Sequence, residues 1–251
     1  MDRNFLFYEN LINGIDFEID GIKFKKGQKF WDLVVITSIS IKQKLCYEKQ
    51  LDIKLKSNRL PKDINFKVIN DPDNCKIGSG GSTLNVIKTL YEVYASELFK
   101  MKILLIHAGG YSQRMPSCSV LGKIFSSIPS RSTYINDTFD LKMAIYTPFS
   151  VHMKPGIFLT SSDDFETFIF KEQIEASHLF GLNDDEFILL AHKSPLEIAK
   201  DHGVYVLNDE SPNKNKKNKY SFGYYDCKTV YQKPSIILRK INSLFELAYS
   251  F

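Results

Sequence analysis

The sequence predicts an α/β fold, a three-layer sandwich with a mostly parallel sheet. Strongly apolar runs occupy residues 33–37 and 103–106, which is typical of strands buried on both faces of a parallel sheet. Segments with helical spacing lie between the expected strands, so strands and helices alternate along the chain. Glycine-rich and polar turns lie next to these elements, where open α/β sheets bind phosphorylated ligands.

Length and composition are those of an ordinary soluble globular protein. The chain has 251 residues, of which 43% are hydrophobic and 25% are charged, so it can bury a core in one large α/β domain or two small ones. Residues 1–29 mix apolar and charged side chains without a clear period. We expect them to form a short solvated lead-in without a chemical role, and we expect one domain over residues 30–251.

Charge and cysteine content exclude several classes of protein. The net charge is +4 and the basic residues are interspersed with acidic ones, so no nucleic-acid partner is expected. The four cysteines show neither metal-site spacing nor a disulfide framework, which indicates reduced thiols. Acidic residues interrupt the apolar N-terminus and no stretch is long enough for a membrane span, so we expect a cytoplasmic protein without a membrane partner. The oligomeric state is left open.

The first expected βα unit begins at the strand Leu33–Thr37. A helix is expected near residues 41–55, where Leu45, Leu51 and Leu55 recur at roughly helical spacing. A second strand at 65–71 is followed by a turn at 71–74, which is rich in Asp, Pro and Asn.

A glycine cluster precedes the next expected helix. Gly78, Gly80 and Gly81 lead into Ser82 and Thr83, and Ser82 is the expected N-cap. Such a loop can bind an anion, because free N–H groups and the helix dipole favour negative charge. The alternative is a plain turn, since the segment is neither a Walker A loop nor a dinucleotide fingerprint. The expected inward face of the helix is Leu84, Ile87, Leu90, Tyr94 and Leu98.

The central strand at 103–106 runs into a second polar loop. His107, Gly109 and Gly110 form the expected turn, which is followed by Ser112, Gln113 and Arg114, and later by Lys123. Two cations and a set of backbone N–H donors suit a displacement at phosphorus, whose transition state spreads negative charge over non-bridging oxygens. The glycines alone would fit an ordinary tight turn. His107 is expected to be a strand-end or core histidine and not a metal ligand.

The remaining elements extend the same pattern. We expect a helix at 136–149 with Phe139, Met143 and Tyr146 facing inward, and a buried strand at 157–159. Asp163 and Asp164 follow that strand, where a carboxylate can coordinate Mg²⁺; the alternative is an acidic turn that caps the next helix. Segments 187–192 and 203–207 are expected to continue the sheet.

Several of these motifs together resemble a known family. Two glycines, an arginine and a lysine about ten residues later resemble the signature loop of nucleotide-sugar pyrophosphorylases. KIGSGGSTLN at 76–85 and ILLIHAGGYSQRMPSCSVLGKIFSSIP at 103–129 resemble the GDP-L-fucose pyrophosphorylase family more narrowly. FWDLVVIT at 30–37, KPGIFLTSSDD at 154–164 and HGVYVL at 202–207 match that family in the same order. Ser112 stands where the wider pyrophosphorylase pattern has a third glycine.

The resemblance implies a nucleotidyltransferase domain at 30–251 with the fold of nucleotide-diphospho-sugar transferases. The implied reaction joins GTP and L-fucose 1-phosphate to give GDP-L-fucose and pyrophosphate, with Mg²⁺ as cofactor. Arg114 and Lys123 would neutralise the triphosphate, and Asp163, in preference to Asp164, would hold the metal. The two glycine loops, with Ser82, Thr83, Ser112 and Gln113, would bind the nucleotide.

The resemblance also implies a longer protein, because family members continue well past residue 251. We therefore expect this chain to correspond to the N-terminal part of the enzyme, with the domain incomplete at its C-terminus. Two alternatives stay open. One is a pyrophosphorylase for another sugar or base, and the other is a non-catalytic protein that binds a nucleotide or a partner.

Overall fold

The computed structural model describes residues 2–72, 75–110, 118–130, 132–181, 187–194, 203–207, 226–232 and 248–250. The chain divides into two compact units, Met1–Asp184 and Asp185–Phe251. The first unit contains every described residue of the expected site.

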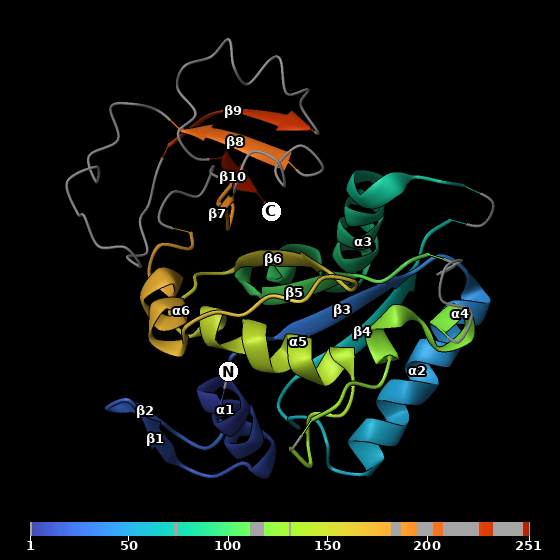
Figure 1. The fold of residues 1–251 in the computed structure, drawn as a ribbon. Coiled ribbons are helices and arrows are strands. Elements are labelled where there is room, and N and C mark those ends of the chain that lie inside the picture. Colours follow the sequence, from blue (N-terminus) through green and yellow to red (C-terminus); the bar gives the residue numbers. More distant parts are fainter. Residues whose placement is uncertain are drawn as a thin grey trace. The chain divides into compact units, whose positions relative to one another are not determined.

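A four-stranded parallel sheet forms the centre of the first unit (Figure 1), in the order β4-β3-β5-β6. Its strands are β3 (Leu33–Ser38), β4 (Asn65–Asn70), β5 (Lys102–His107) and β6 (Gly156–Ser161). All six residues of β3 and the four central residues of β5 are buried. The uninterrupted apolar runs therefore predicted these two central strands correctly, because each has neighbours on both sides and helices over both faces.

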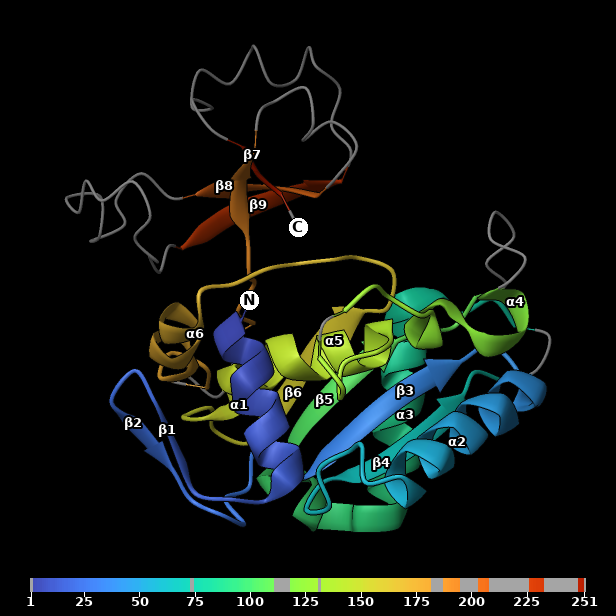
Figure 2. The same cartoon turned by 60° about the horizontal axis from the view of Figure 1, so that its bottom comes forward.

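Helices cover the two faces of this sheet and make three layers (Figures 1 and 2). One face packs against α3 (Gly78–Tyr94) and the 3₁₀ helix η1 (Ala95–Lys100). That core contains Leu33, Val35, Ile69, Val86, Leu90, Leu98, Ile103 and Leu105. The other face carries α2 (Ile41–Lys56) and α5 (Thr138–Tyr146). The predicted α/β class is thus confirmed for this unit.

The buried face of α3 differs from the predicted one, and not all of the leucines with helical spacing in α2 are buried. Leu51 of α2 is buried, but Leu45 is 60% exposed, and the buried positions are Gln43, Tyr47, Leu51 and Lys54. In α3 the buried positions are Ser82, Val86 and Leu90, whereas Leu84 is 69% exposed. The inward-facing polar residues of both helices bind backbone atoms or carboxylates, as Tyr47 binds Ala108 O and Ser82 binds Asp71, so hydrophobicity alone selected the wrong stripe.

Shorter elements connect β5 to the end of the unit. They are α4 (Cys118–Leu121), η2 (Lys123–Phe125), α5, η3 (Thr147–Ser150), β6 and α6 (Phe170–Ser177). The helix expected at 136–149 is α5 continued by η3, and Phe139, Met143 and Tyr146 are buried as predicted. Asp137 is the N-cap of α5 and accepts a hydrogen bond from the Asp140 backbone N–H.

The first residues of the chain are folded into the unit. α1 (Asp2–Asn13) precedes a hairpin of β1 (Phe17–Ile19) and β2 (Ile22–Phe24). Their core contains Phe7, Ile19, Phe24, Phe30, Phe170 and Ile174. The expectation of a solvated lead-in is therefore wrong for the aromatic residues, whose edge-on ring contacts with Phe7 hold the hairpin against the helix.

The second unit contains an antiparallel sheet in the order β7-β10-β8-β9. Its strands are β7 (His192–Ser194), β8 (Gly203–Leu207), β9 (Cys227–Gln232) and β10 (Ala248–Ser250). The prediction that 187–192 and 203–207 continue the parallel sheet is wrong. Burial alternates along β8, with Val204 and Val206 buried, as in an antiparallel strand with one covered face. Among the described helices, none is long and apolar enough to cross a bilayer.

Candidate functional site

The candidate site lies at the carboxyl ends of the four parallel strands. Of these four strands, β3 comes first in the chain. β4 pairs with one side of β3, and the chain then crosses to β5 on the other side of β3. The strand order therefore reverses at β3, and the helices that follow β3 and β5, α2 and α5, cover the same face of the sheet. Ligands of open α/β sheets bind outside the carboxyl ends of the strands at such a reversal, and Gly109 and Gly110 are located there.

The turn after β5 lies against the loop after β3. A Cβ on Gly109 would be 3.5 Å from the Ile39 backbone nitrogen, so any larger side chain would fill this narrow space. Gly110 has a φ of +142°, a conformation that favours glycine. Gln43 joins the two loops, because its Oε1 accepts from Ile39 N–H at 2.9 Å and its Nε2 donates to Gly110 O at 3.1 Å.

Two further side chains fix the beginning of the same turn. The Ala108 backbone N–H donates to Thr37 Oγ1 at 3.1 Å, and the Tyr47 hydroxyl donates to Ala108 O at 3.0 Å. Burial raises the pKa of Tyr47, so its hydroxyl keeps its proton at physiological pH. The turn is held from β3 and from α2, which preorganises its backbone.

The glycine cluster at 78–81 forms the first turn of α3 and is not a loop that precedes the helix. Ile77 is at the N-cap position and makes no side-chain capping bond. The prediction that Ser82 is the N-cap is wrong, because Ser82 is buried within the helix and its Oγ donates to Asp71 Oδ1 at 2.6 Å. A Cβ on Gly78 or Gly80 would meet no atom within 4 Å. The first N–H groups of α3, which lack intrahelical partners, thus lie at an open surface.

Lys123 and Asp163 meet directly, as expected for members of one site. Lys123 Nζ lies 2.8 Å from Asp163 Oδ2, and Ser161 Oγ donates to Asp163 Oδ1 at 3.0 Å. The hydrogen bond from Lys123, supported by the one from Ser161, lowers the pKa of Asp163 despite partial burial. Ser162 N–H also donates to His107 O at 3.0 Å, which links this turn to the end of β5.

Asp164 has a different environment from Asp163. Its Oδ1 accepts from Nζ of Lys142, which is almost fully buried in α5. Neither aspartate caps the next helix, because α6 begins at Phe170 and its N-cap residue makes no side-chain capping bond. The alternative of a capping turn is therefore wrong.

The side chains near Asp163 can be compared with the ligands that Mg²⁺ requires. The exposed carboxylate of Asp163 fits an ion that uses one or two protein carboxylates together with substrate phosphates. Within the described ranges, no group of three or more His, Cys, Asp or Glu side chains could hold a metal by itself. A metal beside Asp163 would need further ligands in addition to the described carboxylates.

The structure brings together most, but not all, of the expected site residues. Five features lie at the carboxyl ends of the parallel strands, namely the first turn of α3, Gly109, Gly110, Lys123 and Asp163. Ser112, Gln113 and Arg114 lie outside the described residues.

Sequence reasoning missed four residues that shape this edge, namely Thr37, Gln43, Tyr47 and Asp71. Asp71 directly follows β4, and its place after a strand was an available signal although the segment was interpreted only as a turn. Thr37 is the polar end of an apolar run and was available in the same way. Gln43 and Tyr47 had no such signal, because Gly110 O and Ala108 O, which they bind in the β5 turn, are backbone atoms more than 60 residues away.

Gly122 allows a test of how Lys123 is positioned. Gly122 has a φ of +76°, and a Cβ there would lie 2.1 Å from the Tyr47 hydroxyl oxygen. We expect Gly122→Ala to lower the free energy of unfolding by about 1–3 kcal/mol more than the matched Gly27→Ala. Gly27 has a φ of +74° with nothing within 4 Å of its Cβ position, so it shares the backbone strain but not the clash. Equal losses in urea denaturation would show that Tyr47 does not constrain this position.

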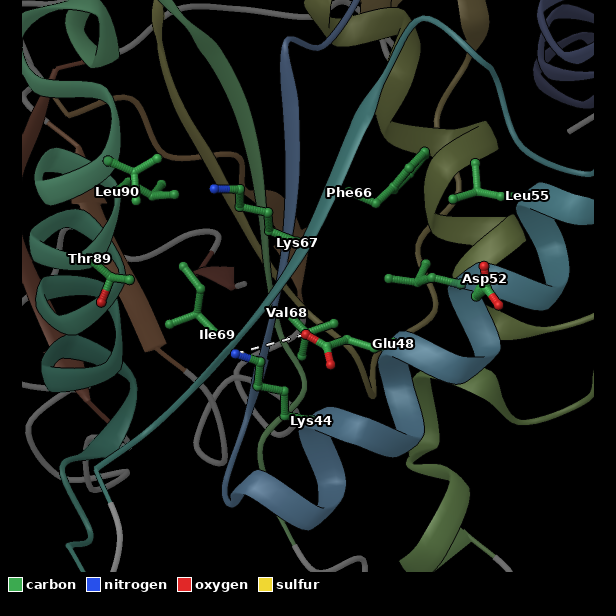
Figure 3. Close-up of a pocket in the computed structure, with 12 residues that line it drawn as sticks. Lys44, Glu48, Asp52, Leu55, Phe66, Lys67, Val68, Ile69, Thr89 and Leu90 are labelled. Carbon is green, nitrogen blue, oxygen red and sulfur yellow. Dashed lines mark ion pairs between the residues drawn. The ribbon is translucent and has the colours of Figure 1, made fainter.

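A separate groove lies away from the strand ends (Figure 3). It has a volume of about 420 Å³ and runs along the outer edge of β4 between α2 and α3. Lys44 and Glu48 form an ion pair at its rim, and Leu51, Val68 and Leu90 are among its apolar lining. None of the expected site residues that the structure describes lines this groove.

Comparisons with known proteins agree with the motifs at the strand ends. Residues 95–240 match the fucose pyrophosphorylase domain. The chain is 39% identical over 219 residues to the fucose-1-phosphate guanylyltransferase of Homo sapiens, covering 87% of this chain and 34% of the human protein. It is 28% identical over 204 residues to the bifunctional fucokinase/GDP-fucose pyrophosphorylase of Arabidopsis thaliana, covering 70% of this chain and 19% of that protein.

The chain matches only part of the length of its curated relatives. The matched region spans about a third of the human protein, with 34% covered, and of its Mus musculus counterpart, with 35% covered. No solved structure matches the chain. The domain match extends over more than half of the chain, and the chain therefore belongs to the fucose pyrophosphorylase family.

Proposed function

We propose that this chain binds GTP at the carboxyl ends of β3 and β5 and takes part in forming GDP-L-fucose from GTP and L-fucose 1-phosphate. The observation that supports it most is the convergence of the β5 turn, the first turn of α3 and Lys123 on one sheet edge. The guanine base and the fucose sugar rest on the family relationship. The fold we propose is that of the nucleotide-diphospho-sugar transferases.

In the proposed reaction, a phosphate oxygen of L-fucose 1-phosphate attacks the α-phosphorus of GTP. The bond from that phosphorus to the oxygen bridging to the β-phosphate breaks, and pyrophosphate leaves. No covalent intermediate with the protein is needed, so the protein acts by positioning and by stabilising charge. Backbone N–H groups of Gly109, Gly110 and the first turn of α3 would bind phosphate oxygens, together with Ser112 and Gln113.

Lys123 and Arg114 would neutralise the triphosphate as the charge on pyrophosphate develops. Lys123 already lies in an ion pair with Asp163, with 2.8 Å between Nζ and Oδ2. Phosphate oxygens would replace Asp163 as the acceptor of Lys123, and the freed carboxylate would become a ligand for Mg²⁺. Such an ion supplies further neutralisation of the phosphate charge. We assign Asp164 to Lys142 and not to the metal.

The enzymatic proposal is tested by the reverse reaction. We would incubate the 251-residue chain with GDP-L-fucose, Mg²⁺ and labelled pyrophosphate, and measure labelled GTP. Formation of labelled GTP that depends on the chain supports the assignment. Replacing GDP-L-fucose with other nucleotide sugars tests the alternative of a pyrophosphorylase for a different sugar or base.

A second candidate function is binding without turnover, and the groove along β4 favours it. β4 is an edge strand, and exposed Leu55 and Val93 line the groove beside it. An edge strand with apolar flanks is a surface that a partner can cover. GTP binding without any labelled product, combined with turnover by a longer family member under the same conditions, would favour this candidate.

The proposed metal role of Asp163 makes a separate prediction. We expect Asp163→Asn to reduce the Mg²⁺-dependent gain in GTP affinity about tenfold, because the carboxylate ligand is lost. The free energy of unfolding should change by less than about 1 kcal/mol, since the ion pair of Asp163 is at the surface. Calorimetric titration of GTP with and without Mg²⁺ measures the effect.

Asp52→Asn is the matched control, because Asp52 forms an exposed ion pair with Lys56 at 2.6 Å. It should leave GTP binding unchanged. If Asp163→Asn and wild type gain the same affinity from Mg²⁺, Asp163 is not a metal ligand.

A further inference from the structure

His107, the last residue of β5, connects two parts of the candidate site. Its Nε2 lies 2.9 Å from Thr83 Oγ1 at the beginning of α3, and its Nδ1 lies 3.4 Å from Thr37 Oγ1 at the end of β3. The ring therefore spans three elements, although His107 itself is half-buried. The nucleotidyl transfer proposed above does not use it.

The neighbouring hydrogen bonds indicate which ring nitrogen carries the proton. Thr83 Oγ1 donates its only proton to Ser79 O at 3.0 Å, so toward His107 it can only accept. Nε2 must then be the protonated nitrogen. Thr37 Oγ1 already accepts from Ala108 N–H at 3.1 Å, which leaves its own proton for Nδ1. One neutral tautomer thus satisfies every group in the chain of hydrogen bonds.

The surroundings favour this neutral form. Burial lowers the pKa of His107, and the charge of Asp71 opposes that effect only partly. Asp71 also binds Ser82 of α3, with 2.6 Å between Ser82 Oγ and Asp71 Oδ1. The beginning of α3 is consequently held from β4 through Asp71 and from β5 through His107.

We propose that His107 is a positioning residue that fixes the first turns of α3 relative to the β5 turn, so that both glycine-containing segments bind one triphosphate together. The inference rests on the proposed function, because it requires that both segments contact the nucleotide. Thr37 is shared by the ring of His107 and by the N–H of Ala108. A displacement of the ring would therefore disturb both segments at once.

Two substitutions remove the link from opposite ends. We expect His107→Leu and Thr83→Val each to weaken GTP binding about tenfold, the size of one lost hydrogen bond with its positioning effect. The double variant should lose little more than either single variant, because both remove the same link. His107→Gln, whose amide N–H₂ can replace Nε2–H, should recover most of the affinity.

Thr89→Val is the matched control for Thr83→Val. Thr89 Oγ1 donates to Asn85 O at 2.8 Å, four residues earlier in α3, as Thr83 Oγ1 does to Ser79 O. Both variants lose this bond within the helix, and we expect them to lose similar thermal stability. Only Thr83→Val should lose GTP affinity, so a purely structural effect on α3 can be recognised.

The measurements are calorimetric titration with GTP and ¹⁵N NMR of the histidine ring. A ring protonated at Nε2, with coupled losses in the two variants, supports the inference. A ring protonated at Nδ1, additive losses, or wild-type affinity in both variants would overturn the inference alone. If wild type itself does not bind GTP, the proposed function is overturned and the inference is overturned with it.

Discussion

A Lys123→Gln variant is expected to lose at least about 100-fold in turnover of GDP-L-fucose and pyrophosphate, whereas its fold stays intact. The expectation follows from charge, because the transition state at phosphorus develops negative charge that a fixed cation stabilises by several kcal/mol. Glutamine keeps a hydrogen-bond donor of similar length but removes the charge. The change at the surface should cost less than about 1 kcal/mol of stability, because the Lys123 side chain is 33% exposed and its Asp163 partner 54% exposed.

Lys56→Gln is the control for Lys123→Gln. Lys56 also pairs with an aspartate at the surface, with 2.6 Å between Nζ and Asp52 Oδ2, but it lies in the last turn of α2, away from the strand ends. It should leave turnover unchanged. Equal turnover in wild type and Lys123→Gln would remove Lys123 from the proposed mechanism.

The largest effect on stability is expected at Lys54. Its Nζ lies 2.7 Å from Asp137 Oδ2 and 2.7 Å from Asp140 Oδ1, and the exposed fractions of the three side chains are 5%, 11% and 0%. Lys54→Met would leave two buried carboxylates, and among the described residues the cation that still pairs with them would be Arg59, 3.4 Å from Asp140. We expect a loss of about 3–5 kcal/mol in the free energy of unfolding, because an uncompensated buried charge is costly.

Lys56→Met, two residues along the same helix, is the control and should cost about 0–1 kcal/mol, because its ion pair with Asp52 is exposed. Urea denaturation of both variants makes the comparison. Similar small losses would show that the buried cluster does not hold α2 against α5.

The pH dependence of this cluster has a definite sign. Burial and then the charge of Asp137 raise the pKa of Asp140 from 3.8 to about 6, although Lys54 acts in the opposite direction. The folded state therefore binds this proton more tightly than the unfolded state does. The stability supplied through Asp140 is complete below pH 3.8 and is lost as pH rises through about 6. The loss caused by Lys54→Met should accordingly be smaller at pH 5 than at pH 7.5.

The central strands β3 and β5 could be predicted from the sequence, because a strand at the centre of a parallel sheet is apolar along its whole length. The apolar runs of β3 and β5 are uninterrupted, as expected for strands buried on both faces. The alternation of strands and helices then places the carboxyl ends of the parallel strands on the same side of the sheet. The exposed Leu45 and Leu84 both fit helical spacing, which indicates a helix but does not by itself identify the buried face. The buried face of α2 contains Tyr47, which binds the distant backbone atom Ala108 O. The buried face of α3 contains Ser82, which binds the polar side chain of Asp71. Neither contact can be recognised from hydrophobic spacing.

The site was predictable at the level of motifs but not of contacts. Glycine turns, Lys123 and Asp163 follow or precede strands and helices, so their residue types and positions indicate a phosphate site. Nothing local indicates that Lys123 binds Asp163, which is 40 residues later, or that Asp164 binds Lys142. The segment 203–207 is apolar at every position after Gly203, so its residues give no sign of the alternating burial that it has in an antiparallel sheet.

The most direct test of the central claim is the set of backbone amides that GTP perturbs in ¹H–¹⁵N NMR spectra of the 251-residue chain. We expect the shifts to concentrate in two segments, the first turns of α3 at 78–83 and the β5 turn at 108–110. Residues of the β4 groove such as Leu51, Val68 and Leu90 should be unaffected. Shifts confined to the groove, or no shifts at saturating GTP, would contradict a nucleotide site at the strand ends.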